Sequence, residues 1–426
     1  MDVIVATGKI LSSIINDHIS FGAALKAFRE QKTGTNNEIN MVGSLTHVSL
    51  KHLLASQNFL KTHLSVPLVP NEETYLIALI SEVAFHHKLS DEVLNKSISE
   101  LYAEDNSFSL TVEEVEILLT LVKATPNLLP LENDVTSEEY LSLKYNTPAW
   151  LVKMWGKMMS VAVLERYLKA NQYRAPNTFR VNPLLTTRDF VLATDAKFSA
   201  GPATNSLIYT GNKSIRNHEL VQKDFIYAQP LAESYVYDLI NVKKLEDCLI
   251  YESRFNHSYL DLSYRSENKL KIDLAVAAKT REINLEYELT HAKIKNIFVF
   301  HSAPSSIITA LRSKRDLVVV IPNNSQFDLI RKTPDYFLHF NQDDLDNYIF
   351  EAKTALEECA AFTRNGGQLL YLVNTCSNKE GHGLIEDFIM SHRDFSLVSE
   401  KQFLPIDEYK STLYYALLSR KDVHNA

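Results

Sequence analysis

Hydrophobic periodicity changes once along this chain, and the change restricts the possible folds. Through residues 4–125 apolar side chains recur at helical spacing, as at Ile10, Ile14 and Ile15, and no alternating strand pattern interrupts them. Beyond residue 220, short apolar runs alternate with helical segments. Because that alternation builds parallel strands joined by helices, the sequence predicts an all-helical domain followed by a doubly wound α/β domain.

The α/β part contains six runs with strand character. They are 248–251, 271–276, 297–300, 317–321, 369–373 and 413–418. A helix is predicted over 345–362, with a C-terminal turn at 365–367, and a separate strand over 178–181. We therefore expect four parts: a helical domain over 1–125, an acidic linker over 126–147, a basic connector subdomain over 148–220 and the α/β domain over 221–421.

Charge is unevenly distributed between these parts. Residues 1–140 carry nine Lys and Arg against nineteen Asp and Glu, whereas residues 144–182 carry seven Lys and Arg and the single acid Glu165. A polyanion would be repelled by much of the first segment and attracted to the second. A solvated helix face is the alternative explanation of the basic segment.

Glycine and cysteine are both scarce. The chain has 11 glycines in 426 residues, although phosphate-cradling loops need glycine where the backbone approaches a ligand. Its three cysteines show no CxxC spacing, which favours a reducing compartment over a zinc site or disulfides. We find no signal-peptide pattern and no run of 18 apolar residues, and so expect a cytoplasmic protein with neither membrane nor metal partner.

Several motifs occur in an order that points to a known family. Pro-Ala-Trp-Leu stands at 148–151, a run from Ala-Asn through Ala-Pro to Phe-Arg-Val-Asn at 170–182, and Asn-Gly-Gly-Gln-Leu-Leu-Tyr at 365–371 leads into Thr375-Cys376-Ser377. The chain thereby resembles the Sun (RsmB-type) 16S rRNA cytosine-C5 methyltransferases over nearly its whole length. The resemblance implies a NusB-like helical RNA-binding domain in front of a Rossmann-like, doubly wound domain that binds S-adenosylmethionine. It also implies that Cys376 is the nucleophile that attacks cytosine C6; a small buried side chain at a strand end is the alternative role.

The cofactor motifs of that family are altered. Its loop Asp-x-Cys-Ala-Ala-Pro-Gly-Gly-Lys corresponds to residues 250–258, where the aligned side chains include Ile250, Glu252, Asn256, His257 and Ser258. No glycine remains there, so close approach of a cofactor to the backbone is hindered.

Two further cofactor and catalytic positions have also changed. The ribose-binding acid corresponds to Ala275, with Asp273 two residues earlier, and the family's Asp-Ala-Pro-Cys-Ser corresponds to 321–325, where Ile321 and Asn324 replace the acid and the cysteine.

Three functions follow as hypotheses. The first is a catalytically degenerate homologue that binds RNA or the ribosome through Lys153, Lys157, Arg174 and Arg180, two of which adjoin aromatic rings as in RNA-binding surfaces. The second is a still-active enzyme that uses Cys376 with S-adenosylmethionine. The third is a scaffold that binds protein partners through the acidic helical domain.

Overall fold

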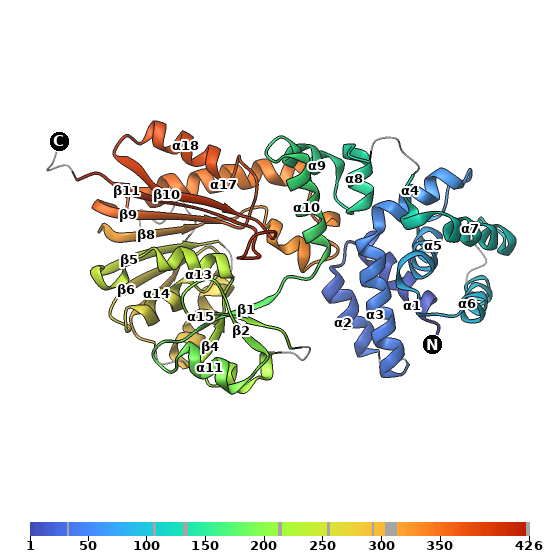
Figure 1. Cartoon of the computed structure of the whole chain (residues 1–426), viewed down its shortest axis with the longest axis horizontal. Helices are drawn as coiled ribbons and strands as arrows, with labels where there is room; N and C mark the ends of the chain where they lie inside the picture. The colour runs from blue at the N-terminus through green and yellow to red at the C-terminus, as the bar shows by residue number, and fades with distance from the viewer. Residues whose placement is uncertain are drawn as a thin grey trace. The chain divides into compact units, whose positions relative to one another are not determined.

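The chain forms two compact units, which are described separately. The computed structural model describes residues 1–31, 34–104, 108–130, 135–211, 215–253, 256–291, 294–302 and 313–422. The helical unit comprises Met1–Tyr173 and Leu329–Asn341, and the α/β unit comprises Arg174–Asp328 and Gln342–Ala426 (Figure 1). The segment Leu329–Asn341, between β8 (Arg315–Ile321) and α17 (Gln342–Ala360), therefore belongs to the helical unit.

The helical unit is built around α1. Its helices are α1 (Val3–Ile15), α2 (Phe21–Glu30), α3 (Asn36–Lys51), α4 (Leu53–His63), α5 (Pro70–Ser81), α6 (Asp91–Glu104), α7 (Val112–Ala124), α8 (Glu138–Lys144), α9 (Ala149–Gly156) and α10 (Val161–Gln172), with the shorter η1 (Glu82–His86), η2 (Pro126–Leu128) and η7 (Tyr336–Leu338). Ile4, Leu11 and Ile14 of α1 are fully buried in the core of this unit. Gly8 allows close packing on α5, because a Cβ there would lie 2.0 Å from Cδ1 of Tyr75.

Part of the predicted linker over 126–147 is helical. Ser137 caps α8 by accepting a hydrogen bond from the Tyr140 amide, and acidic residues occupy the first turn. The following Asn146 accepts a hydrogen bond from the Leu54 amide at 2.9 Å and donates to the Leu50 carbonyl at 2.9 Å. This segment is therefore joined to α3 and α4, which the acidic composition alone did not indicate.

The α/β unit begins with a small antiparallel sheet of order β2-β3-β1-β4. Its elements are β1 (Asn177–Val181), α11 (Arg188–Thr194), β2 (Phe198–Ala200), β3 (Ser206–Tyr209), η3 (Ile215–Asn217), α12 (Glu219–Gln222) and β4 (Ile226–Ala228). Phe179 and Val181 of β1 pack with Leu207 of β3 in its core. The strand predicted over 178–181 is therefore confirmed.

The main sheet has the order β10-β11-β9-β8-β5-β6-β7 among the described residues. Its elements are α13 (Leu231–Asp238), η4 (Val242–Lys244), β5 (Asp247–Glu252), α14 (Ser258–Arg265), β6 (Lys271–Val276), α15 (Lys279–His291), β7 (Ile297–His301), β8 (Arg315–Ile321), η6 (Phe327–Arg331), α17 (Gln342–Ala360), β9 (Thr363–Val373), α18 (His382–Ser391), β10 (Phe395–Phe403) and β11 (Leu413–Arg420).

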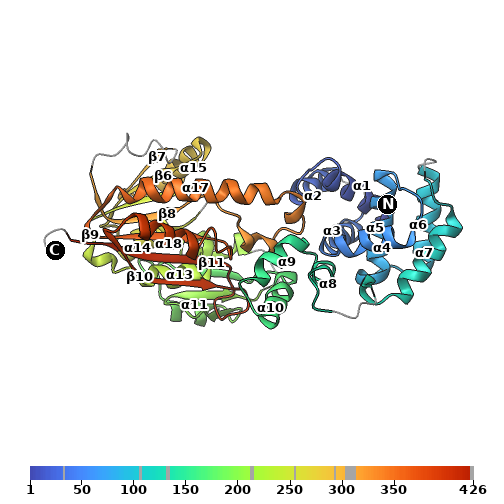
Figure 2. The same ribbon diagram turned by 90° about the horizontal axis from the view of Figure 1, so that it is seen from above.

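Helices cover both faces of this sheet. Side chains of β5 alternate, so Ile250 packs with α13, α14 and α15 on one face, and Leu249 packs with α17 and α18 on the other. Figures 1 and 2 show these two helical layers with the sheet between them. All six predicted strands are present, and the doubly wound arrangement is confirmed.

Two details of the sheet differ from the prediction. The sheet is mixed, since β11 pairs antiparallel with β9 and with β10. β10 was not predicted, because only its end residues Phe395 and Phe403 are buried, and the apolar and polar residues between them do not alternate. The predicted turn at 365–367 lies inside β9. There the pairing shifts from Arg315 opposite Thr363 to Leu317 opposite Gln368, and Gly366 accommodates the bulge with a φ of +74°.

Candidate functional site

The carboxyl ends of β5 and β6 are where an open α/β sheet places its ligands. β5 brings Glu252 to this edge, where its side chain is 1% exposed. Its Oε1 lies 3.4 Å from Nε of Arg281, which comes from the first turns of α15. Burial raises the pKa of Glu252 to about 8, although Arg281 opposes that shift. A buried carboxyl and a guanidinium therefore contact each other at this edge.

The loop after β5 is held by its own side chains. Asn256 Oδ1 accepts a hydrogen bond from the Ser258 amide at 2.7 Å, and His257 Nδ1 lies 2.7 Å from the Ala228 carbonyl oxygen of β4. Residues 254–255 lie outside the described part of the chain. Ile250 is a fully buried core residue of β5.

The residues present do not fit a cofactor of the S-adenosylmethionine type. Such a group needs glycine backbone after the first strand and an acid at the end of the second. No glycine occurs in residues 252–258. On β6, which is the second strand in this sense, Ala275 is fully buried, and Asp273 accepts a hydrogen bond from Nε of Arg315 at 2.9 Å. The Asp273 carboxylate is therefore occupied by another side chain.

Residues 321–325 and 375–380 meet at the carboxyl ends of β8 and β9. Ser325 Oγ lies 2.7 Å from Thr375 Oγ1, and Glu380 accepts hydrogen bonds from the Ser325 amide, the Ser325 hydroxyl and the Thr375 hydroxyl at 2.7, 2.7 and 2.8 Å. Cys376, next to Thr375, is fully buried, and Asn324 is 2% exposed. The neighbourhood of Cys376 is thus a closed polar cluster.

Sequence reasoning missed Glu380, which organises this cluster. Burial raises its pKa, and its hydroxyl and amide donors oppose that shift. An acid a few residues after Thr375-Cys376-Ser377 was the available signal, but its partner Ser325 is 55 positions away. Only the parallel pairing of β8 with β9 brings the two loops together.

The predicted RNA-binding residues fall into two groups. Lys153, Lys157 and Arg174 are exposed, and Lys153 lies 4.0 Å from Glu138. Arg180 is 2% exposed, and it pairs with Asp238 and, at 3.1 Å, with Asp261. A guanidinium enclosed in this way is not accessible to RNA phosphates, so the surface role predicted for Arg180 is wrong. The cause is that β1 is covered on both faces, which a run of four residues does not reveal.

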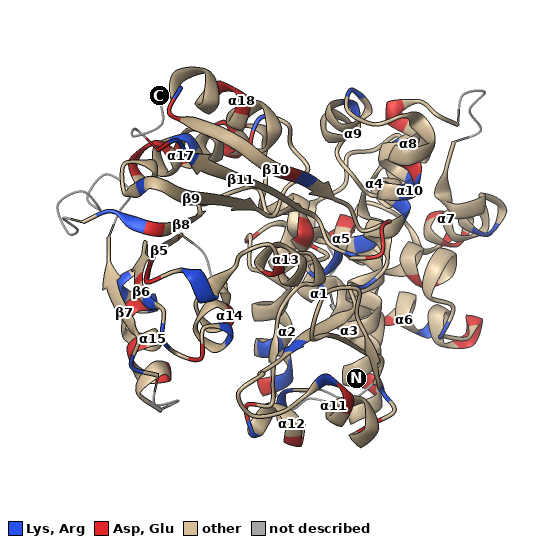
Figure 3. Cartoon of the chain, turned by 60° about the vertical axis from the view of Figure 1, so that its left-hand side comes forward, with Lys and Arg blue, Asp and Glu red and all other residues tan. Residues whose placement is uncertain are grey.

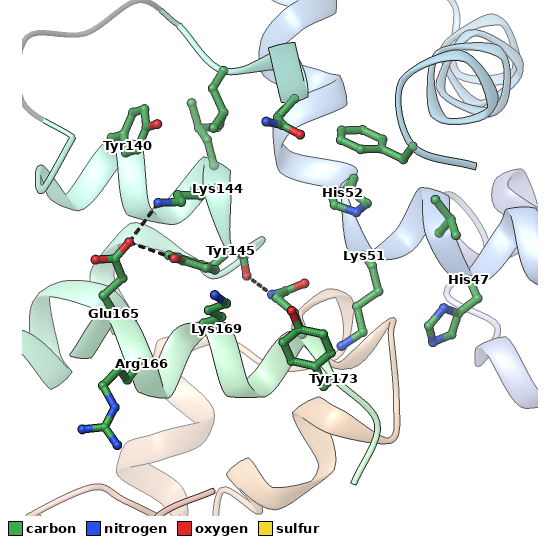
Figure 4. A pocket seen from close by; sticks show the side chains of 16 residues that line it. His47, Lys51, His52, Tyr140, Lys144, Tyr145, Glu165, Arg166, Lys169 and Tyr173 are labelled. Atoms are coloured by element: carbon green, nitrogen blue, oxygen red, sulfur yellow. Dashed lines mark hydrogen bonds and ion pairs between the residues drawn. The ribbon is translucent and has the colours of Figure 1, made fainter. Parts of the chain in front are cut away.

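The helical unit contains a pocket of about 940 Å³ that is rich in cations and rings (Figure 4). It lies among the α3–α4 junction, α8, α10 and the residue after α10. The basic side chains that line it are Lys51, Lys144, Arg166 and Lys169, the histidines are His47 and His52, and the other rings are Phe85, Tyr140, Tyr145 and Tyr173. Among the described residues that line it, Glu165 is the only acid.

The carboxylate of Glu165 is already paired with side chains of the pocket. Glu165 Oε1 accepts hydrogen bonds from Lys144 at 2.8 Å and from the Tyr145 hydroxyl at 2.9 Å. Those donors lower the pKa of Glu165. In the ranges that the structure describes, Lys169 has no ion-pair partner. Figure 4 shows Lys169 between the Lys144–Glu165 pair and Tyr173.

Lys51 is the buried cation of the pocket. It is 9% exposed, and its Nζ donates to the carbonyl oxygens of Asn171 at 3.2 Å and Ile330 at 2.9 Å. Burial, together with the charge of Arg331, lowers the pKa of Lys51 to about 8. The charge pattern indicated the segment 144–182, but it did not indicate that Lys51 joins it.

None of the described helices combines the length and the apolar character that crossing a membrane requires. Within the same residues, His, Cys, Asp and Glu side chains form no group of three or more that could hold a metal ion.

Comparison with known proteins gives structural likeness only. No protein-family model and no curated protein sequence matches the chain. Among solved structures, the protein PH0851 is 17% identical with a TM-score of 0.75, and the match covers 99% of each chain. A methyltransferase homolog protein from Pyrococcus horikoshii is 16% identical with a TM-score of 0.58, covering 68% of this chain and all of that one.

A third structure, NSun6 from Pyrococcus horikoshii with SFG, is 12% identical with a TM-score of 0.55, covering 64% of this chain and 98% of that one. These likenesses confirm the fold class expected from the sequence. The chain has a helical N-terminal region followed by a Rossmann-like domain of the methyltransferase type.

Proposed function

We propose that this protein binds RNA and no longer transfers a methyl group. The observation that carries the proposal is the buried Glu252–Arg281 contact at the carboxyl end of β5, where a methyltransferase fold holds its cofactor. The loop that follows bonds to itself and to β4 through Asn256 and His257. A cofactor would have to displace these contacts. Because the loop has no glycine, the cofactor also could not approach the backbone closely.

Exposed cations support the RNA-binding half of the proposal. Lys153, Lys157 and Arg174 are accessible, and the pocket of the helical unit adds Lys169. RNA affinity of this kind depends on salt, because each phosphate contact releases a counterion. The resemblance to the Sun family makes ribosomal RNA the target to test first.

Isothermal titration with S-adenosylmethionine and S-adenosylhomocysteine tests the loss of methyl transfer. We expect no saturable heat up to about 1 mM, where binding is worth only ~4 kcal/mol. Binding of a ribosomal RNA fragment, followed by fluorescence anisotropy, should weaken steeply as salt rises. One-to-one cofactor heat would overturn the first half of the proposal, and absence of RNA binding at low salt would overturn the second.

An active RNA cytosine-C5 methyltransferase is the second candidate function. It is favoured by one observation: residues 321–325 and 375–380, which match the two catalytic segments of the family, lie together through Ser325, Thr375 and Glu380. In this candidate the thiolate of Cys376 attacks cytosine. Methyl transfer from labelled S-adenosylmethionine to ribosomal RNA, abolished by Cys376→Ser, would establish it. A protein that binds neither cofactor nor RNA would leave the scaffold hypothesis.

A further inference from the structure

We infer that the pocket of the helical unit receives one unpaired nucleotide of an RNA strand, with its phosphate between Lys51 and Lys169 and its base against the ring of Tyr173. This inference rests on the proposed RNA binding and adds the site and the form of the ligand. It concerns the helical unit alone.

The charge of Lys51 is not balanced by an acid among the described residues. Its ammonium is buried, and its two hydrogen-bond partners are neutral carbonyl oxygens. Within the described ranges no carboxylate lies at ion-pair distance from it. A desolvated cation is costly unless a counter-charge approaches it. An anion in the pocket would supply that charge, and it would raise the lowered pKa of Lys51.

The pocket combines aromatic rings with cations. Tyr173 is 61% exposed at the end of α10, and Lys169 lies beside it in the pocket (Figure 4). An exposed ring beside a cation is the arrangement on which unpaired bases stack while phosphates pair with lysine. An acidic peptide would use the cations but not the flat face of the ring. RNA is therefore the better match.

The volume of the pocket fits a nucleotide. A volume of about 940 Å³ lies at the upper end of the range for sites that enclose small ligands, so it has room for one nucleotide. Bases within an A-form duplex are stacked and cannot enter a concave pocket without being unpaired. The site should therefore select single strands over duplexes.

An excess of positive charge in the helical unit is confined to part of an otherwise acidic surface. Residues 1–140 carry an excess of ten acidic side chains, so most of this segment repels a polyanion. Figure 3, which colours the ribbon by charge, shows basic positions on α9 and α10. An RNA strand approaching the helical unit is thereby directed to the part of its surface where the pocket lies.

Anisotropy of a labelled single-stranded RNA of about eight nucleotides tests the inference. The variant Lys169→Ala/Tyr173→Ala should bind about tenfold or more weakly than wild type, since one stacked base and one phosphate contact are lost. Both side chains are exposed, so the variant should fold. Lys61→Ala, which removes an exposed charge of α4 outside the pocket lining, is the matched control and should bind as wild type does. Tyr173→Phe keeps the ring and should retain most of the affinity.

The outcomes separate the inference from the proposed function. If wild type binds the strand and the double variant binds it equally well, the pocket is not the site, although RNA binding stands. Duplex RNA that binds as tightly as the single strand, or poly-glutamate that displaces the strand as well as unlabelled RNA does, would also overturn the inference. If wild type binds no RNA at low salt, the proposed function fails together with it.

Discussion

The partners of buried titratable groups differ between the two units, and the difference distinguishes structural contacts from the proposed ligand site. In the α/β unit, the buried carboxyl groups near the strand ends contact side chains of the same unit: Glu252 contacts Arg281, and Glu380 accepts from Ser325 and Thr375. In the helical unit, buried Lys51 contacts only carbonyl oxygens and opens into a pocket.

The physical reason lies in the cost of burying a charge. A buried ionised or polar group persists when its partners are supplied by the fold, and such a group has little left to offer a ligand. A group that still lacks a counter-charge can gain it from a ligand. The Rossmann-like domain therefore carries the expected topology with buried side chains in contact at its strand ends, whereas the acidic helical unit carries the proposed ligand site.

The largest expected effect concerns Arg180, the most enclosed cation of the α/β unit. Arg180→Ala leaves Asp261, which is fully buried, without its 3.1 Å partner. We expect the free energy of unfolding to fall by about 3–5 kcal/mol. Urea unfolding followed by far-UV circular dichroism measures this change.

The matched control for Arg180 is Arg174→Ala. Arg174 is exposed, so its removal should change stability by less than about 0.5 kcal/mol. A loss below about 1 kcal/mol for Arg180→Ala would contradict the structural role assigned to that residue. At temperatures where the Arg180 variant remains folded, its RNA affinity should equal that of wild type.

A smaller effect is expected at Glu252, and it depends on pH. The pKa of Glu252 is about 8 in the folded protein against an ordinary value of 4.5, so the folded state retains a proton that the unfolded state releases. Its contribution to stability is complete below pH 4.5 and is lost as pH rises to about 8. Glu252→Gln removes this dependence. The variant should gain stability relative to wild type by about 1–3 kcal/mol between pH 5 and pH 8.5.

The measurement is the melting temperature of both proteins over this pH range. A difference that does not change with pH would show that Glu252 is ionised in the folded state. The Glu252–Arg281 contact would then be an ion pair within the fold, and the contrast with Lys51, which has no carboxylate partner among the described residues, would become sharper.

The smallest effect is expected for the rate at which a thiol reagent modifies the cysteines of the native protein. Cys248, Cys359 and Cys376 are all buried, and burial raises the pKa of the first two. A thiol reagent should therefore modify none of them quickly in the native protein and all three after denaturation. A single fast-reacting thiol that disappears in Cys376→Ser would instead favour the active-enzyme candidate.

Local patterns in the sequence were sufficient for the order of elements. The helical spacing over residues 4–125 and the six apolar runs correspond to observed helices and strands, because periodicity expresses which face of an element is buried. β10 was missed because no side chain between Phe395 and Phe403 is buried, so the strand carries no such pattern. The change in the loop after β5 could likewise be predicted from the sequence, because the absence of glycine is a property of residues that are adjacent in the chain.

Tertiary structure alone decided which charges are buried and which meet. Arg180 changed from an expected surface cation to an enclosed one because β1 lies between β3 and β4 in its sheet, and because Asp238 of α13 and Asp261 of α14 pair with the guanidinium. Lys51 lies 120 positions from its partner Asn171, and Glu380 lies 55 positions from Ser325. Solvation and pairing depend on neighbours that are distant in sequence, and only the packing of whole elements brings those neighbours together.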